Sequence, residues 1–388
     1  MSTYKALDYY DVDALLSDEE RMVRDTVRSF VDEQVLPIIV AHSRAATFPT
    51  ELVPRLADLG VLGANLHEQG LPGIGEVAYG LVMQELERGD SGLRSFASVQ
   101  GSLVMYPILT FGSEAQKERW LLRLHRGEAI GCFGLTEPDH GSDPGGMETR
   151  AVRKGSGWTL DGSKAWITNG SIADVAVIWA RTEDGIRGFL VEKGTPGYTT
   201  SDIRGKFSLR ASVTSDLSFQ DVRLPDDAIL PGAKGLRCPL MCLSQARYGI
   251  AWGAVGSAMA VYDETLRYAK NRTQFGKPLA GFQLVQKKLA WMVNEITKAQ
   301  LLILRLGRLK EQGAAMPARI SLAKMNNVDM ALEIARLGRD ILGANGTHDE
   351  YQTGRHMCNL EAVKTYEGTH DIHTLIVGED VTGIPAFA

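Results

Sequence analysis

The sequence predicts an α+β protein in which a helical part, a smaller β-rich part and a second helical part follow one another. Apolar residues recur at helical spacing before about residue 130 and again after about residue 241. Between these regions lie several short β-rich runs, which are typical of a small, mostly antiparallel sheet. Helices separated in this way from strands define the α+β class. We place the domains at 1–131, 132–235 and 236–388.

Two helix-start signals mark the N-terminal domain. Ser17 with Glu20, and Ser113 with Gln116, have the spacing of a capping box, in which two side chains satisfy unpaired N–H groups at the start of a helix. The N-terminal domain is therefore predicted to be helical. We expect the helix after Ser17 to bury one apolar face, formed by Met22, Val23, Val27, Phe30 and Val31.

Short runs of β-forming residues mark the middle domain, at 175–180, 189–191 and 213–222. Asp161 and Gly162 stand beside strand-forming residues, and this pair predicts a turn. The stretch 230–235, which contains proline and glycine, predicts the exit from the sheet.

Two long helical patterns mark the C-terminal domain. The second covers 320–342, and Gly343 and Gly346 predict its end. The first has one apolar face, formed by Val285, Leu289, Met292, Ile296 and Ile303.

The composition excludes several classes of protein. The formal net charge of -5 gives no general attraction to nucleic acid or to anionic membranes. Four cysteines are too few for a disulfide framework, so we expect a reducing compartment, either the cytoplasm or the mitochondrial matrix of a processed eukaryotic chain. The first residues lack the pattern of a signal peptide. No apolar run reaches the roughly 18 residues of a membrane span.

Two motif-like patterns do not predict a site. The stretch 73–78 fits G-x-G-x-x-A, but no buried strand precedes it, so we expect a loop that enters a helix and no Rossmann domain. Cys238 and Cys242 fit no common zinc spacing, and no carboxylate-rich helix frames His370 and His373. We expect structural thiols and a polar loop there, and no metal site.

Three separated stretches, 133–143, 164–169 and 272–278, resemble flavin-contact motifs of the acyl-CoA dehydrogenase family. The resemblance runs from about residue 15 to the C-terminus. It implies an N-terminal helical domain, a middle antiparallel β domain, a C-terminal four-helix bundle and FAD as cofactor. In this family the partners are an acyl-CoA substrate and an electron-transferring flavoprotein, and the assembly is a homotetramer.

The chemistry of a flavin suits these stretches. Backbone and hydroxyl groups can satisfy its polar rim, and Trp166 can cover part of its ring. Arg272 can donate two bonds to a pyrophosphate, which in the family belongs to FAD across a subunit interface. The alternative for Arg272 is a surface salt bridge. The flavin contacts that the resemblance implies are Phe133, Leu135, Thr136, Ser142, Trp166, Ile167, Thr168, Arg272, Gln274, Phe275, Gln283, Leu342, Gly343, Thr369, His370 and Asp371.

The stretch 366–369, Tyr-Glu-Gly-Thr, resembles the catalytic segment of the family and implies that Glu367 is the base. A buried carboxylate can take the weakly acidic α-proton of a thioester, because burial raises its pKa toward the working pH. Gly368 lets the backbone approach the ligand. The alternatives are that Glu367 is an exposed turn residue, or that Glu361 is the base.

The stretch 87–95 resembles the glutaryl-CoA dehydrogenase subfamily, in which an arginine meets the distal carboxylate of the substrate. A buried carboxylate must be paired, and Arg94 offers a permanent charge and a two-pronged donor. Glu87 and Tyr366 are associated with the decarboxylating form, which yields crotonyl-CoA and CO2. The implied substrate contacts are Arg94, Ser95, Glu87, Ser142, Arg247, Tyr248, Tyr366, Gly368 and Phe387.

Three rival functions stay open at this point. Arg94 could be a surface or helix-capping residue in an acyl-CoA dehydrogenase for short, non-carboxylated chains. An acyl-CoA oxidase would use O2, although that family usually has a longer chain. A non-catalytic flavoprotein that binds acyl-CoA would not need Glu367.

Overall fold

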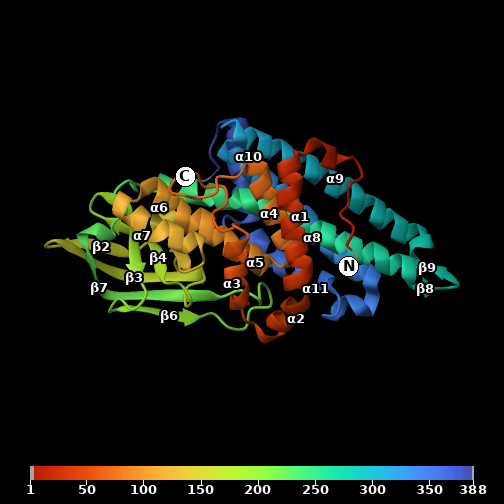
Figure 1. Ribbon diagram of the computed structural model, residues 1–388, viewed down its shortest axis with the longest axis horizontal. Coiled ribbons are helices and arrows are strands. Elements are labelled where there is room, and N and C mark those ends of the chain that lie inside the picture. Colours follow the sequence, from red (N-terminus) through yellow and green to blue (C-terminus); the bar gives the residue numbers. More distant parts are fainter. Residues whose placement is uncertain (1–3, 387–388) are drawn as a thin grey trace.

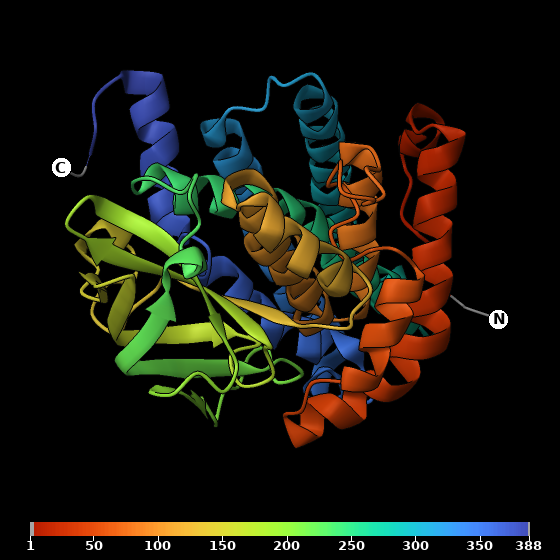
Figure 2. The ribbon, with the colours of Figure 1, turned by 60° about the vertical axis from the view of Figure 1, so that its left-hand side comes forward.

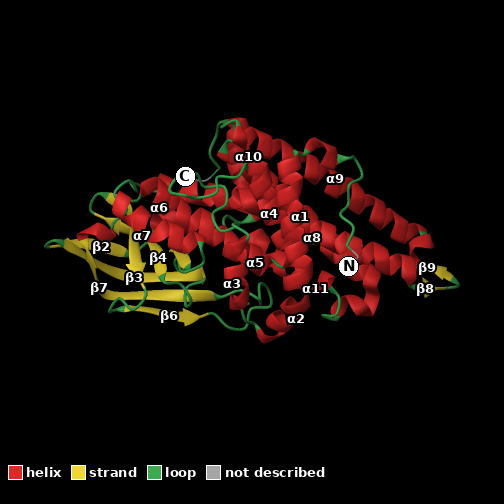
Figure 3. Cartoon of the chain, viewed as in Figure 1, coloured by secondary structure: helices red, strands yellow, loops and turns green. Residues whose placement is uncertain are grey.

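A computed structural model describes residues 4–386 and shows the predicted order of helices, strands and helices (Figures 1 and 3). The sheet forms one end of the elongated molecule, and helices form the rest (Figure 1). After a turn of the view, the short helices that precede the sheet are seen to lie between it and the other helices (Figure 2). No helix of the described residues is long and apolar enough to cross a membrane.

The N-terminal region is helical, as predicted, and both capping boxes are formed. Met22, however, is 64% exposed and does not belong to the buried face. The buried face of this helix is narrower than we predicted. The helix α4 is buried along nearly its whole length. The helices are α1 (Asp18–Phe30), α2 (Leu36–Ala45), α3 (Val53–Asp58), α4 (Glu76–Gly89), α5 (Ser91–Ser98), α6 (Tyr106–Phe111) and α7 (Glu114–His125).

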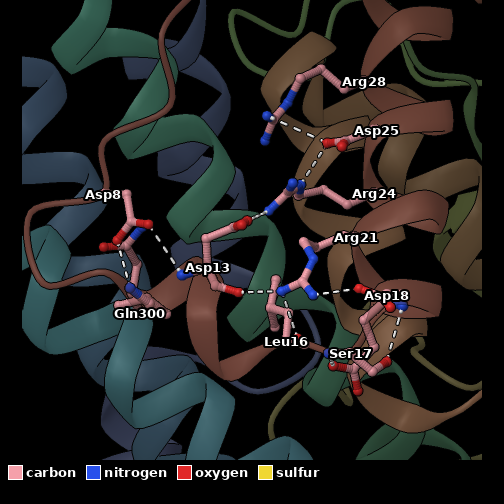
Figure 4. Close-up of polar contacts among 12 residues, drawn as sticks. Asp8, Asp13, Leu16, Ser17, Asp18, Arg21, Arg24, Asp25, Arg28 and Gln300 are labelled. Carbon is pink, nitrogen blue, oxygen red and sulfur yellow. Dashed lines mark hydrogen bonds and ion pairs between the residues drawn. The ribbon is translucent and has the colours of Figure 1, made fainter.

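The segment before α1 is bound to the helices behind it (Figure 4). Arg21 donates to the carbonyl oxygens of Asp13 and Leu16, at 2.9 and 2.7 Å. Arg24 pairs with the carboxylate of Asp13. Gln300 of a C-terminal helix donates to the carbonyl of Leu7 at 2.7 Å. These bonds connect the start of the described chain to both helical regions.

The sheet is mostly antiparallel, and its strand order is β1-β4-β2-β3-β7-β6, with β5 paired to β4. Only the pairs β1–β4 and β2–β4 among the described strands are parallel. The predicted β-rich runs lie in β4, β5 and β7. The strands are β1 (Gly131–Gly134), β2 (Arg150–Lys154), β3 (Gly157–Thr168), β4 (Val175–Thr182), β5 (Gly185–Glu192), β6 (Tyr198–Asp202) and β7 (Thr214–Pro225).

The turn predicted at Asp161 and Gly162 is wrong. Both residues lie inside β3, at a bulge where the register with β7 shifts. The Asp161 carboxylate accepts from the N–H of Asp221 at 2.7 Å, so the polar side chain is used across the sheet. A bulge and a turn both favour glycine, which is why the local pattern does not separate them. The hairpin between β2 and β3 turns instead at Gly155, where φ is 60°.

The C-terminal helices α8, α9, α10 and α11 pack on one another, and α12 packs on α10. The pattern over 320–342 is confirmed as α10, which ends before Gly343 at φ 61°. His370 and His373 were expected in a polar loop, but they lie on the first turn of α12, because Thr369 caps that helix. The predicted domain boundaries stay a prediction. The elements are α8 (Arg237–Asn271), β8 (Thr273–Gln274), β9 (Lys277–Pro278), α9 (Gln283–Glu311), α10 (Pro317–Leu342), α11 (Gln352–Thr365) and α12 (His370–Thr382).

Close contact between α4 and α8 depends on small residues. A Cβ built on Gly80 of α4 would stand 2.2 Å from the ring of Trp252, and one on Gly256 of α8 would stand 1.9 Å from the carbonyl oxygen of Gln84. The two backbones can therefore approach only because these side chains are missing.

We expect Gly80→Ala to destabilise the protein by about 1–3 kcal/mol, because the methyl group must displace a buried indole. A lower midpoint of thermal unfolding of the FAD-loaded protein checks this. Gly378→Ala is the matched control: that Cβ would meet nothing within 4 Å on α12, and alanine favours a helix. Equal midpoints for Gly80→Ala and the wild type would contradict the account of α4 packing.

Candidate active site

A four-residue loop, 366–369, joins α11 to α12 and carries Glu367. Glu367 has φ 53°, and Gly368 has φ 98°. Left-handed φ values cost about 1–2 kcal/mol for a residue with a side chain. A Cβ on Gly368 would also stand 2.8 Å from Nε2 of His373 and 3.2 Å from Nη2 of Arg247. The loop conformation therefore requires glycine at 368 and imposes strain at 367.

Glu367 is partly buried, and its carboxyl atom Oε2 is buried without a hydrogen-bond partner among residues 4–386. Burial raises the pKa of this carboxyl, against the lowering effect of Arg94, Lys324 and Arg247, whose positive charges lie nearby. His373 stays neutral beside the loop, because burial lowers the pKa of its imidazole to about 3. Glu367 is thus not the exposed turn residue of the alternative.

Glu361, the rival base, lies on α11 and forms an ion pair of 2.8 Å with Arg336. Its side chain is 39% exposed. A carboxylate that is paired at the surface is occupied by its partner and open to solvent, so we assign this position a structural role.

Arg94 is fully buried on α5, which rules out a surface arginine. Its Nε donates to Oε2 of Glu87 on α4 at 2.5 Å, and Nη2 bonds to the hydroxyl of Tyr366. Burial disfavours the guanidinium charge, but Glu87, Tyr366 and Glu367 together outweigh this effect and raise the pKa of Arg94. Ser95 Oγ lies 3.4 Å from the hydroxyl of Tyr366. The structure therefore brings the predicted residues 87, 94, 95 and 366 together, next to Glu367.

The other predicted substrate contacts are less closely grouped. Arg247 lies at the loop, and its Nε donates to the carbonyl of Glu367 at 2.7 Å. Tyr248 is fully buried behind it and donates to the carbonyl of Glu76 at 2.7 Å. Ser142 is exposed in the segment between β1 and β2. Phe387 lies outside the described residues.

The first two predicted flavin stretches meet on the sheet. Phe133 and Leu135 are buried, and the carbonyl of Thr136 accepts from the N–H of Ala165 at 2.9 Å. Ile167 is buried and Thr168 partly buried. Trp166 is 62% exposed with φ 61°, and it lines a groove of about 530 Å³ with residues of β6 and β7. The exposed indole of Trp166 suits the face of a flat ring, and the neighbouring backbone suits its polar rim. The unpartnered carboxyl oxygen of Glu367 suits a ligand bound beside that ring.

Lys164 and Glu137 bind these two stretches together, and our sequence analysis gave them no role. Lys164 Nζ donates to Glu137 at 2.8 Å and to the carbonyl of Leu135 at 3.1 Å. Glu137 also accepts from the N–H groups of Glu148 and Thr149. The three bonds that Glu137 accepts, together with the charge of Lys164, act against its burial and lower the pKa of Glu137 to about 2. The signal in the sequence was a charged residue beside apolar ones in each stretch, Glu137 after Phe133 and Leu135, and Lys164 before the run 165–167.

The third flavin stretch lies elsewhere. Arg272, Gln274, Phe275 and Gln283 are exposed on and after the hairpin β8–β9, at the end of the molecule opposite the sheet (Figure 1). Arg272 makes no ion pair within residues 4–386, so the salt bridge of the alternative is not formed there. Leu342 and Gly343 belong to this end, since Asn345 in the same turn donates to Tyr268 near the end of α8 at 3.0 Å.

The remaining predicted flavin contacts are on α12. Thr369 caps the helix by accepting from the N–H of Ile372 at 3.2 Å, and His370 and Asp371 form its first turn. Cys238 and Cys242 are buried free thiols, and the described residues contain no cluster of potential ligands that could hold a metal ion.

Lys324 was missed by sequence reasoning. It lies on α10, is 1% exposed, and donates to the carbonyls of Tyr366 and Gly368 at 2.5 and 2.6 Å. The available signal was a lysine spaced four residues from Ile320 and from Val328, on the apolar face of a helix. Charges on such faces are almost never fully buried unless they are paired.

Comparison with known proteins defines the class of this protein. The family models for the N-terminal, middle and C-terminal domains of acyl-CoA dehydrogenases match residues 17–128, 132–222 and 233–382. The chain belongs to the acyl-CoA dehydrogenase family, so it is an oxidoreductase with FAD as its cofactor. The predicted family, fold class and cofactor are confirmed.

Particular relatives narrow the similarity. The chain is 36% identical to the mitochondrial short-chain specific acyl-CoA dehydrogenase of Bos taurus over 370 residues, which cover 93% of this chain and 90% of that protein. It is similar to a crystal structure of glutaryl-CoA dehydrogenase from Mycobacterium smegmatis, with 55% identity, a TM-score of 0.96 and 97% of each chain covered. A second glutaryl-CoA dehydrogenase of that organism, in complex with FADH2, has 52% identity, a TM-score of 0.98 and full coverage of both chains.

We expect Lys164→Met to lower the FAD content of the purified protein, because it leaves the Glu137 carboxylate buried without its cation. Removing one partner of such a pair costs about 3–5 kcal/mol. The ratio of flavin absorbance to protein absorbance after gel filtration measures the loss. Lys154→Met on the exposed part of β2 is the control and should keep full FAD content. Full FAD content in Lys164→Met, as in the control, would argue against a role for the ion pair.

Proposed function

We propose that this protein oxidises glutaryl-CoA and decarboxylates the product to crotonyl-CoA and CO2. The observation that carries the proposal is a buried guanidinium, Arg94, at the site of a buried carboxyl group, Glu367. The similarity to two glutaryl-CoA dehydrogenases at 52–55% identity supports the choice of substrate.

Glu367 is the proposed base. Its Oε2 is buried and unpartnered, so it is available to a proton of the substrate, and burial raises the pKa of the carboxyl group. Bound FAD supplies the acceptor for the β-hydride. The strained loop fixes the direction of the carboxyl group, which limits how far the base can move from the α-carbon.

The charge balance of the site favours an anionic acyl chain. Arg94, Arg247 and Lys324 provide three cations, whereas Glu87 and Glu367 provide two carboxylates, so one positive charge is left without a partner when all five are ionised. Glu87 accepts from Nε of Arg94 and Tyr366 bonds to Nη2, whereas Nη1 makes no hydrogen bond within the described residues. A distal carboxylate would supply both the missing charge and an acceptor.

Decarboxylation follows from the position of that carboxylate. Removal of the α-proton and the β-hydride converts glutaryl-CoA into glutaconyl-CoA. The new double bond is conjugated with the thioester and adjoins the carbon that bears the carboxylate. When the bond to CO2 breaks, its electron pair stays on the chain and is delocalised through the double bond into the thioester. One proton then completes crotonyl-CoA. Glu87 and Tyr366, which mark the decarboxylating form in the subfamily that the sequence resembles, both contact Arg94.

Assembly and electron transfer belong to the same proposal. The two groups of predicted flavin contacts lie at opposite ends of one chain, so a single FAD can meet both only if two copies contribute (Figure 1). This supports a homo-oligomer, and the family resemblance implies a homotetramer. An electron-transferring flavoprotein would accept the electrons, and the free thiols suit the cytoplasm or the mitochondrial matrix.

We expect Glu367→Gln to lower kcat with glutaryl-CoA by about 10²–10⁴-fold, since the amide cannot act as a base. Reduction of an artificial acceptor measures kcat, and the visible spectrum verifies that FAD is still bound. Wild-type activity of Glu367→Gln would refute the proposed chemistry and favour a non-catalytic acyl-CoA-binding flavoprotein. Peroxide formation without an added acceptor would identify an oxidase.

We expect Arg94→Met to lower kcat/KM for glutaryl-CoA by at least about 10²-fold, because a substrate carboxylate and Glu87 would then be buried without a cation. The double variant Arg94→Met/Glu87→Gln is the matched control, since it removes the whole ion pair, and it should lose glutaryl-CoA but retain butyryl-CoA turnover. Mass spectrometry of the product from the wild type should find crotonyl-CoA. A wild-type preference for butyryl-CoA would favour the short-chain alternative.

A further inference from the structure

Lys324 extends from α10 into the loop that carries Glu367, and no step of the proposed reaction uses it. Its Nζ binds the carbonyl oxygens of Tyr366 and Gly368, which are the residues on either side of Glu367. The side chain of Lys324 is almost completely buried, so its ammonium group depends on these two carbonyls for hydrogen bonds.

The loop needs such partners. Three consecutive carbonyls, 366 to 368, point toward cations, because Arg247 binds the middle one at 2.7 Å. Unbound buried carbonyls would cost about 1–3 kcal/mol each. The left-handed conformation of Glu367 costs a further 1–2 kcal/mol, roughly. A loop with both costs would relax to another conformation and turn the carboxyl group away.

The ammonium group also acts on the carboxyl group through its charge. Burial lowers the pKa of Lys324 to about 7, while the charge of Glu367 opposes this effect. Lys324 and Glu367 therefore favour each other's ionised form. The other titratable or charged groups that face Glu367 are Arg94, Glu87, Tyr79, Arg247, Tyr366 and His373, from α4, α5, α8, the loop itself and α12.

We propose that Lys324 is the positioning residue for the base: it holds the loop so that Glu367 faces the substrate, and its charge favours the carboxylate over the carboxylic acid. The inference rests on the proposed role of Glu367. It differs from a purely structural role in one respect, since a structural lysine would affect stability without changing the protonation of Glu367.

The test compares Lys324→Met, Lys324→Gln and Lys364→Met in the FAD-loaded protein. Lys364 is the matched control, because it also connects α11 to α10, through Asp329, but at the surface. The measurements are FAD content and kcat and KM for glutaryl-CoA as a function of pH, with an artificial acceptor. We expect Lys324→Met to lose about 10²-fold in kcat, as for a base displaced by about 1 Å, with little change in KM.

The position of the acid limb of the kcat profile is the decisive readout. Loss of a positive charge raises the pKa of a nearby carboxyl, so the limb should move to higher pH in Lys324→Met. Lys324→Gln should regain part of kcat, because its amide can donate to a carbonyl, but its limb should be displaced in the same direction. Lys364→Met should match the wild type in both respects.

An acid limb at the wild-type pH in Lys324→Met would overturn the inference, whether or not kcat is lower. Should Lys324→Met fail to retain FAD, the limb of Lys324→Gln decides the question by the same criterion. The proposed function has a separate test. Wild-type activity in Glu367→Gln would refute the role of Glu367 as the base. An inactive Glu367→Gln, together with an unchanged acid limb in Lys324→Met, would refute only the role of Lys324.

Discussion

The structure depends on burying several charges at one point, where each cation is hydrogen-bonded by a carboxylate or by backbone carbonyls. Arg94 comes from α5, Glu87 from α4, Arg247 from α8 and Lys324 from α10, and all of them are almost completely buried around the loop of Glu367. A buried charge is tolerated only with a partner, and here each partner comes from another element. The hydrogen bond from Arg94 to the hydroxyl of Tyr366 joins the N-terminal helices to the loop between α11 and α12, so the site is complete only in the docked arrangement.

Small residues make this docking possible. A Cβ on Gly253 of α8 would stand 2.8 Å from Oε2 of Glu87 and 3.3 Å from Nε of Arg94, so the missing side chain leaves room for the ion pair. Glycine inside a helix costs about 1 kcal/mol relative to alanine, and here the contact between α4 and α8 offsets that cost. In the sheet, the buried pair of Lys164 and Glu137 holds the strand β3 against the segment that follows β1. Both halves of the site thus depend on buried ion pairs.

The sequence predicted what local chemistry determines. Capping boxes, the end of α10 before Gly343 and the run of strands depend on neighbours in the chain, and they agree with the structure. What it did not predict depends on partners that are distant in the sequence. Asp161 is inside a strand because a backbone N–H of β7 faces it, and Lys324 is buried because carbonyls 42 and 44 residues away accept its protons. The local pattern of each residue is equally compatible with a turn or with an ordinary helix surface.

The two carboxylates of the site show how one side chain acquires two roles. Glu87 forms an ion pair with Arg94, and its hydrogen-bonded oxygen is committed to that guanidinium. Glu367 has three cations nearby, but two of them, Lys324 and Arg247, donate their hydrogen bonds to the loop carbonyls. Its Oε2 therefore has no hydrogen-bond partner within the described residues. The charges favour ionisation while the geometry leaves a lone pair available, which is the combination that a general base requires. Had the same cations bound the carboxylate directly, Glu367 would be a stable ion pair and a poor base.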